Sequence, residues 1–204
     1  MTADGQARSY HHGDLRKALL AAGEAELAEK GVEGFTLRGC AKRAGVSHAA
    51  PAHHFKDANA LLTALATEGF QRFIAAMRKR QESAATPQER LTAAGLGYVD
   101  FARANPALFR LMFSSSRPDC TDAVFERTSR ESFDILLESV SAVRSVDPMA
   151  DRDAMIDVAA AWAMVHGIAE LLLSERTPFL AAVAGGNPDT VFAELISRSV
   201  PMTR

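Results

Sequence analysis

The sequence predicts an all-α fold of about nine helices arranged in two blocks. Nearly half of the 204 residues are apolar, few are aromatic, and Ala dominates, which suits helices that pack closely together. Leu, Ala, Glu, Arg and Met outnumber the β-branched residues in most windows, and this favours helix over strand. Several pairs of a capping residue and a proline mark helix starts, and no segment alternates in the manner of a strand.

The first block is expected to contain four helices, over about residues 14–30, 37–44, 48–54 and 58–82. Thr36 is a suitable N-cap, because its hydroxyl can accept a hydrogen bond from an unpaired backbone N–H. Gly45 tolerates the left-handed conformation in which many helices end, so the chain is expected to reverse there. Ser47 and Asp57 are expected to cap the two helices that follow.

The second block is expected to contain five helices, over about residues 87–104, 106–113, 121–144 and 151–174 and from 188 onward. The segment Thr86-Pro87-Gln88-Glu89 combines an N-cap, a proline at the first helical position and a glutamate three residues after the cap, which together make a capping box. Asn105-Pro106, Asp147-Pro148 and Asn187-Pro188 are expected to mark helix starts in the same way. The polar segment 114–119 is expected to be a loop.

Charge is distributed unevenly along the chain. The net charge of −2 at first argues against a nucleic-acid partner. However, residues 1–80 hold 12 Lys and Arg against 8 Asp and Glu, a net +4, and residues 81–204 hold 11 against 17, a net −6. Within the first helix, Glu26 and Glu29 are expected to face solvent. The sequence therefore predicts a mildly basic N-terminal module on an acidic body.

The cysteines and the apolar segments indicate a cytoplasmic protein. Cys40 and Cys120 do not make a disulfide framework, and both are expected to be reduced and partly buried. The N-terminal segment lacks the apolar core of a secretory signal. The most apolar run, Val158–Leu173, contains His166 and Glu170 and is shorter than a membrane span. We therefore expect a cytoplasmic chain that does not enter a membrane.

Residues 36–55, TLRGCAKRAGVSHAAPAHHF, have the layout of a helix-turn-helix. Two short helices meet at a turn that contains Gly45, and Val46 can fill the angle between them. The second helix of such a motif enters a DNA major groove. In these residues and the LysAspAlaAsnAlaLeuLeu that follows, the chain resembles the N-terminal domain of TetR-family transcriptional regulators, and the resemblance covers roughly residues 10–66.

The resemblance implies two domains and three kinds of partner. A helix-turn-helix DNA-binding domain is expected over residues 1–66, with residues 1–9 as a flexible arm, and a helical effector-binding and dimerisation domain over residues 67–204. The expected function is that of a homodimeric repressor that binds a palindromic double-stranded DNA operator and is released by a small-molecule effector. The same fold acting as an activator, or as a regulator without an effector, is the alternative.

Exposed side chains at the N-terminal end of the second helix are expected to meet base edges. Here these residues are His48, Ala49, Ala52 and His53, a sparse set from which modest base specificity is expected. Ala52 stands where the family usually has an aromatic residue, and Pro51 is expected to bend or shorten the helix. Other predicted DNA-binding residues, mostly phosphate contacts, are Thr36, Arg38, Lys42, Ser47, His54 and Lys56.

Trp162 and the sequence Val165-His166-Gly167 resemble the C-terminal domain of a TetR subgroup named for its Trp-His-Gly signature. On this apolar helix, His166 is either a core histidine with a hydrogen-bond partner or a polar group in an effector pocket, and both interpretations stay open. The pocket is expected to be largely apolar. Its predicted residues are Phe101, Phe109, Met112, Phe133, Trp162 and His166.

In the TetR family the last two long helices of each subunit form a four-helix dimer interface, which implies the same use here. Ala159, Ala163 and Gly167 recur every fourth residue, so another helix can approach closely along that side. Apolar periodicity alone cannot separate such an interface from a monomer core. The predicted interface residues are Ala159, Ala163, Gly167, Val191, Phe192, Leu195 and Ile196.

A catalytic or metal-binding function is the rival hypothesis. His11, His12 and Asp14 invite a metal interpretation, but adjacent histidines do not easily share one ion, and Asp14 more simply caps the first helix. A small helical enzyme or ligand carrier would use these histidines or His166. No Gly-rich phosphate loop, nucleophile elbow or metal-spaced cluster supports it. We therefore expect no enzymatic activity, no cofactor and no metal.

Overall fold

The computed structural model describes residues 12–176, 178 and 187–199, and in this part of the chain the fold is all-α, as predicted. The expected N-terminal arm, residues 1–9, and His11 lie outside the described residues, as do the side chains of His12 and Asp14. Eight α-helices and one 3-10 helix, η1, make up the regular structure of the described residues. They are α1 (His12–Lys30), α2 (Leu37–Ala44), η1 (Ala50–His53), α3 (Ala58–Gln81), α4 (Pro87–Ala104), α5 (Pro106–Ser114), α6 (Ala123–Arg144), α7 (Arg152–Leu173) and α9 (Pro188–Ser199).

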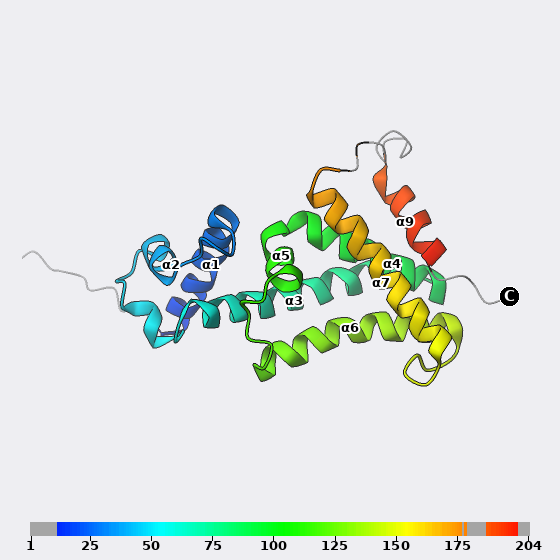
Figure 1. Ribbon diagram of the computed structural model, residues 1–204, viewed down its shortest axis with the longest axis horizontal. Helices are drawn as coiled ribbons and strands as arrows, with labels where there is room; N and C mark the ends of the chain where they lie inside the picture. The colour runs from blue at the N-terminus through cyan, green and yellow to red at the C-terminus, as the bar shows by residue number, and fades with distance from the viewer. Residues whose placement is uncertain (1–11, 177, 179–186, 200–204) are drawn as a thin grey trace, which may run out of the picture.

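The N-terminal block consists of α1, α2, η1 and the start of α3 (Figure 1). Val46, in the turn after α2, packs against the core of this block, as predicted. Burial of one large apolar side chain contributes about 1.5–3 kcal/mol, so even this small core holds α2 and η1 against α1. The core side chains are Leu19, Leu27, Phe35, Cys40, Phe55, Leu61 and Leu62.

Helix α3 belongs to both blocks and runs along the long axis of the molecule (Figure 1). Near its start, Leu61 and Leu65 lie beside Gly23 of α1. One turn after Leu65, Gly69 lies beside Met112 of α5. The expected domain boundary between residues 66 and 67 therefore falls inside one continuous helix.

Several predicted helix starts carry the expected caps. The Thr86 hydroxyl accepts from the Glu89 N–H at 3.2 Å, and the Glu89 carboxylate accepts from the Thr86 N–H at 3.1 Å, which completes the capping box of α4. Asp57 caps α3 by accepting from the Ala60 N–H at 2.8 Å. These contacts satisfy backbone donors that have no partner inside the helix.

Two segments that were predicted to mark helix starts, Asn105-Pro106 and Asp147-Pro148, do not provide the expected side-chain cap. Asn105 precedes α5 but does not cap it, because its Nδ2 donates to the Phe101 carbonyl at 3.1 Å instead. Asp147-Pro148 belongs to a turn, and α7 begins later, where Asp151 accepts from the Ala154 N–H at 2.8 Å. A capping residue followed by proline is also common in turns, so the pattern alone does not place a helix.

The C-terminal block packs α4 to α9 around the second half of α3. Helix α4 contacts α3, α5, α6, α7 and α9. It approaches α3 closely at Gly97, where a Cβ would lie 2.7 Å from the Ala76 carbonyl oxygen. Arg80 of α3 joins three helices through ion pairs with Asp100 of α4 at 2.6 Å and Asp189 of α9 at 2.9 Å.

Candidate DNA-binding interface and effector pocket

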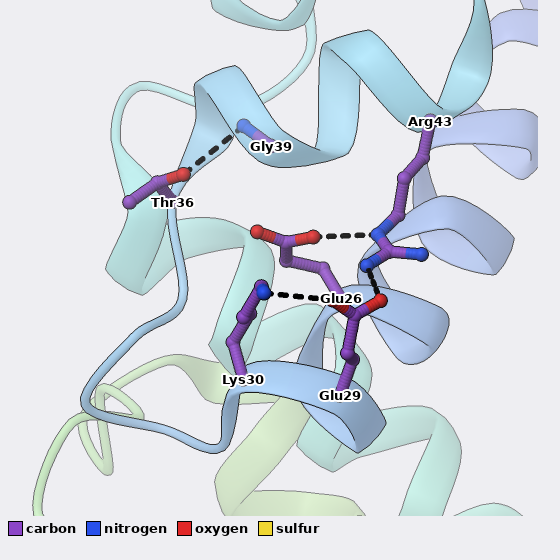
Figure 2. Close-up of polar contacts among 6 residues, drawn as sticks. All are labelled: Glu26, Glu29, Lys30, Thr36, Gly39 and Arg43. Atoms are coloured by element: carbon purple, nitrogen blue, oxygen red, sulfur yellow. Dashed lines mark hydrogen bonds and ion pairs between the residues drawn. The ribbon is translucent and has the colours of Figure 1, made fainter.

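Helix α2 begins as the sequence predicts. The Oγ1 of Thr36 accepts from the Gly39 N–H at 3.0 Å, and the backbone of Thr36 is extended (Figure 2). The side chains of Arg38 and Lys42 are exposed, whereas Cys40 is buried. The helix therefore presents cations to solvent and its apolar side to α1.

The turn after α2 is also confirmed. Gly45 has a φ of 69° and a ψ of 28°, the left-handed conformation that glycine adopts without strain. Its N–H donates to the Lys42 carbonyl at 3.3 Å, and the Val46 N–H donates to the Ala41 carbonyl at 3.1 Å. These bonds satisfy carbonyls at the end of α2 and fix the direction in which the chain leaves it.

The second helix of the motif is shorter than predicted. The expected helix over 48–54 is reduced to η1, a 3-10 helix of four residues, Ala50–His53. Pro51 is buried at its start and has no N–H to donate, so an α-helical bond cannot form at that position. The prediction that Pro51 shortens this helix is confirmed.

The hydrogen bonds before η1 also differ from the predicted cap. Ser47 accepts through its backbone carbonyl, from the Ala50 N–H at 3.0 Å. The N-cap position belongs to Ala49, with no side-chain cap, so the prediction that the Ser47 hydroxyl caps this helix is wrong. The Ala52 N–H donates to the Ala49 carbonyl at 3.2 Å, which continues the three-residue spacing typical of a 3-10 helix.

The predicted DNA contacts lie on α2, on η1 and on the segments beside η1. His54 is half-buried, and its Nε2 is buried without a hydrogen-bond partner among the described residues. It therefore lies behind the others rather than among them. The exposed members, which we call the α2–η1 surface, are Thr36, Arg38, Lys42, Ser47, His48, Ala49, Ala52, His53 and Lys56.

A partly buried ion pair attaches α2 to α1 (Figure 2). Glu26 of α1 is only 6% exposed, and its Oε2 accepts from Arg43 Nε at 2.5 Å. The carboxylate fits because Gly39 has no side chain: a Cβ there would lie 2.5 Å from Glu26 Cδ. Arg43 also pairs with Glu29. The prediction that Glu26 faces solvent is wrong, because its partner lies on the neighbouring helix.

The same charges shift the protonation of their partners. Hydrogen bonds from Lys30 and then Arg43 lower the pKa of Glu29 to about 2. Pairing with Glu29 raises the pKa of Lys30, and hydrogen bonds to Glu26 and Glu29 raise that of Arg43. Around neutral pH, Glu29, Lys30 and Arg43 therefore all carry charge.

Both cysteines are free thiols, as predicted. Burial raises the pKa of Cys40 to about 11, so this thiol stays protonated. Cys120 is exposed, so the expectation that it is partly buried is wrong.

A cavity of about 570 Å³ lies in the C-terminal block. Helices α3, α4, α5, α6, α7 and α9 all contribute to its wall, and apolar and aromatic side chains dominate it. Of the predicted pocket residues, Met112, Phe133 and Trp162 line it. Small-molecule sites in proteins typically measure about 300–1,000 Å³, so the cavity has the size of a ligand pocket.

The other predicted pocket residues lie behind the wall. Phe101 and Phe109 are buried in the core and do not line the cavity. His166 does not line it either, and its Nδ1 lies 2.7 Å from the Oη of Tyr98, which does. This contact gives His166 the hydrogen-bond partner of a core histidine. Tyr98 was missed by the sequence prediction, whose only signal for it is a polar aromatic residue in the apolar stripe of α4.

Helix α7 presents an apolar face to solvent. Ala159 and Ala163 are exposed, and Gly167 has open space where a Cβ would stand. On the same face, Ile156 is 48% and Leu171 is 44% exposed. We call these five residues the α7 strip. They are spaced by three or four positions, as one side of a helix requires.

On α9 the predicted interface residues divide into two groups. Val191 and Leu195 are half-buried. Phe192 is 2% and Ile196 is 1% exposed, and Ile196 lies close to Gly95 of α4. The prediction of a dimer interface at Phe192 and Ile196 is therefore wrong, because α4 and α7 of the same chain already cover this side of α9.

The segment between α5 and α6, residues 115–122, joins the cavity to the N-terminal block. Arg117 Nη1 donates to the carbonyl of Val32, after α1, at 2.8 Å, and its Nε donates to Asn59 Oδ1, at the start of α3, at 2.9 Å. Cys120 of the same segment lines the cavity. This segment therefore contacts both the cavity and the N-terminal block.

Two family models match the chain. Residues 19–65 match the model of bacterial regulatory proteins of the tetR family, and residues 91–198 match the tetracyclin repressor-like C-terminal domain. No curated protein matches the chain.

Solved structures share the fold along almost the whole chain. A protein with unknown function from Rhodococcus sp. RHA1 is 34% identical, with a TM-score of 0.76 and coverage of 95% of this chain and 98% of that one. A TetR-like transcriptional regulator from the same organism is 15% identical, with a TM-score of 0.67 and coverage of 94% and 96%. A TetR family transcription regulator from Marinobacter aquaeolei VT8 is 17% identical, with a TM-score of 0.67 and coverage of 93% and 96%. At the two lower identities the likeness shows the fold alone.

The C-terminal model by itself spans more than half of the chain, and the N-terminal model spans the helix-turn-helix. The chain therefore belongs to the TetR family of DNA-binding transcriptional regulators, a family of proteins that are not enzymes.

Proposed function

We propose that this regulator is a homodimeric repressor, that it binds a palindromic operator through the α2–η1 surface, and that a small-molecule effector releases it. The observation that carries the proposal is the 115–122 segment, in which Arg117 bonds to the N-terminal block while Cys120 lines the cavity. The cavity wall and the N-terminal block that carries the α2–η1 surface are thereby linked through a few residues.

On the DNA side, the cations of the α2–η1 surface hold the phosphate backbone, and His48 and His53 reach base edges. Both imidazoles are exposed, and Ala49 and Ala52 offer methyl groups that can contact thymine. A 3-10 helix of four residues presents few side chains to a groove. Sequence specificity then depends also on the spacing of two half-sites and on DNA shape.

On the dimer side, a second copy covers the α7 strip together with Val191 and Leu195. Small residues at Ala159, Ala163 and Gly167 allow a partner helix to approach closely. Helix α7 is also long and apolar enough to cross a membrane. Its mean hydropathy is 1.6 over a window of 18 residues, and 28% of that window is buried. A single such helix is weak support for a membrane span, and a partner subunit removes the same apolar surface from water.

On the effector side, ligand binding in the cavity favours one of two arrangements of the N-terminal block. The effector must bind the released state more tightly than the DNA-bound state, since equal affinity would shift nothing. Arg117 transmits the difference, because it bonds to Val32 and to Asn59. Trp162, His166 and Gly167 support assignment to the Trp-His-Gly subgroup. A cytoplasmic location is part of the same proposal.

An electrophoretic shift with DNA from upstream of the gene tests the DNA-binding part. We expect a retarded complex that weakens as salt rises. Transcription in vitro from the same fragment then distinguishes repression from activation. A repressor lowers transcript yield, whereas a rise in yield would favour the alternative, an activator on the same fold.

A further inference from the structure

Seven aromatic side chains from five helices line the cavity. Most of their contacts are edge to face: Phe70 and Phe125 lie 5.6 Å apart at 82°, and Phe73 and Tyr98 lie 4.8 Å apart at 81°. Tyr98 and Phe113 are stacked, at 5.9 Å and 27°. Rings in this arrangement offer both edges and faces to a further ring, and such contacts add to the gain from burial. An aromatic ligand therefore fits this wall better than an alkyl chain does. The lining rings include Phe70, Phe73, Tyr98, Phe113, Phe125 and Trp162.

The inside of the cavity has no permanent charge. Among the described lining residues, Glu126 and Arg130 are the only Asp, Glu, Lys or Arg. Their side chains are 59% and 70% exposed, and they pair with each other at 3.2 Å. An ionised ligand inside would lose its water without meeting an opposite charge, which opposes binding. The wall therefore selects against anions and cations alike.

Tyr98 is the buried polar anchor of the wall. Ser132, the other buried hydroxyl among the described lining residues, already donates to the Ser129 carbonyl of its own helix at 2.6 Å. The Oη of Tyr98 contacts His166 Nδ1 at 2.7 Å, and Trp162 is a second hydrogen-bond partner of the same hydroxyl. With one proton and two lone pairs, the hydroxyl keeps one position for a further bond. If Tyr98 donates to His166, its oxygen accepts from a ligand, and in the other tautomer it donates. A ligand hydroxyl, which does both, suits either arrangement.

We propose that the effector is an uncharged molecule with an aromatic body and a hydroxyl group that bonds to Tyr98. This rests on the proposed function, in which the cavity is the effector site. Trp162 is 44% exposed, and its ring lies 5.9 Å from that of Phe133, which also lines the cavity.

Isothermal titration calorimetry of the full-length protein at pH 7 with ring compounds of matched size tests the proposal. The probes are 2-naphthol, naphthalene, the anion 2-naphthoate and the cation 2-naphthylmethylammonium, with 1-decanol as a neutral chain. We expect 2-naphthol to bind at least tenfold more tightly than either ion and more tightly than 1-decanol. Trp162 is the only tryptophan in the chain, so its emission reports whether a probe reaches the cavity.

Tyr98→Phe, combined with the same probes, tests the anchor. We expect it to weaken 2-naphthol about fivefold to tenfold, as loss of one hydrogen bond does, and to leave naphthalene unchanged. Distortion of the cavity by the substitution would weaken both probes equally, so naphthalene is the internal control. Equal losses would overturn the role of Tyr98. The comparison of charged and neutral probes uses the unmodified protein, so it holds even where the variant folds poorly.

Three results would overturn the proposed ligand class: tighter binding of 2-naphthoate or the ammonium probe, tighter binding of 1-decanol, or no binding of any ring probe. An electrophoretic shift with the same protein preparation separates this outcome from failure of the proposed function. A normal DNA shift with no ring binding would reject the ligand class and leave DNA binding intact.

Discussion

The contact between Glu26 and Gly39 predicts that Gly39→Ala destabilises the protein when Glu26 is present and stabilises it when Glu26 is replaced by alanine. In the unmodified protein, Gly39→Ala places a methyl group against the Glu26 carboxylate, which Arg43 holds in position. Overpacking of this kind costs about 1–3 kcal/mol. Alanine gains up to about 1 kcal/mol over glycine inside a helix, so the net loss is about 1 kcal/mol.

Glu26→Ala removes both the carboxylate and the clash. Loss of one partner of a buried ion pair costs about 3–5 kcal/mol, but Arg43 is 30% exposed and keeps Glu29, so we expect about 2 kcal/mol. In that background Gly39→Ala meets no carboxylate and should stabilise by about 0.5–1 kcal/mol, its helix propensity. The coupling energy between the two sites is then about 2 kcal/mol.

Urea unfolding followed by circular dichroism, at one protein concentration for all four variants, measures this cycle, because the stability of a dimer depends on concentration. Equal destabilisation by Gly39→Ala in both backgrounds would refute the close fit between Glu26 and Gly39.

Three further predictions concern charge and assembly. Arg38→Ala should weaken binding to all DNA sequences and lower the slope of log affinity against log salt by about 0.9 per chain, or about 1.8 per dimer, whereas Arg103→Ala, an exposed control on α4, should change neither. Ala163→Glu should yield monomers in sedimentation velocity, because it places a carboxylate in the apolar α7 strip, and Ala75→Glu on exposed α3 surface should not. The pKa of Glu29 falls from about 4.5 to about 2 on folding, so its stabilising effect is complete above pH 4.5 and is lost as the pH falls towards 2. The melting temperatures of the unmodified protein and Glu29→Gln should therefore converge over that range, and a constant gap would contradict the assignment.

Local chemistry made much of the fold predictable from the sequence. Thr36, Gly45 and the Thr86 capping box act through atoms within a few residues of themselves, so their patterns predict helix ends directly. Pro51 is similar, since its missing N–H shortens η1 whatever surrounds it. The resemblance to TetR regulators rested on signals of the same short range, among them Thr36 and Gly45.

Tertiary contacts explain where the sequence predictions were wrong. Glu26 occupies a position that helical periodicity assigns to solvent, and only the approach of Gly39 and Arg43 makes it buried. Phe192 and Ile196 have the spacing of an interface, but periodicity does not indicate which helix covers a stripe. The cavity likewise depends on six helices that meet in space, so half of the predicted pocket residues lie behind its wall.

The proposed function requires that two copies of this chain bind DNA through their α2–η1 surfaces. Footprinting of the upstream fragment, combined with the mass of the complex in sedimentation, tests it most directly. We expect an even number of chains per duplex and two protected major-groove half-sites separated by about 34–36 Å or a multiple of it. One chain per duplex with a single protected half-site, or protection unchanged by Arg38→Ala, would contradict it.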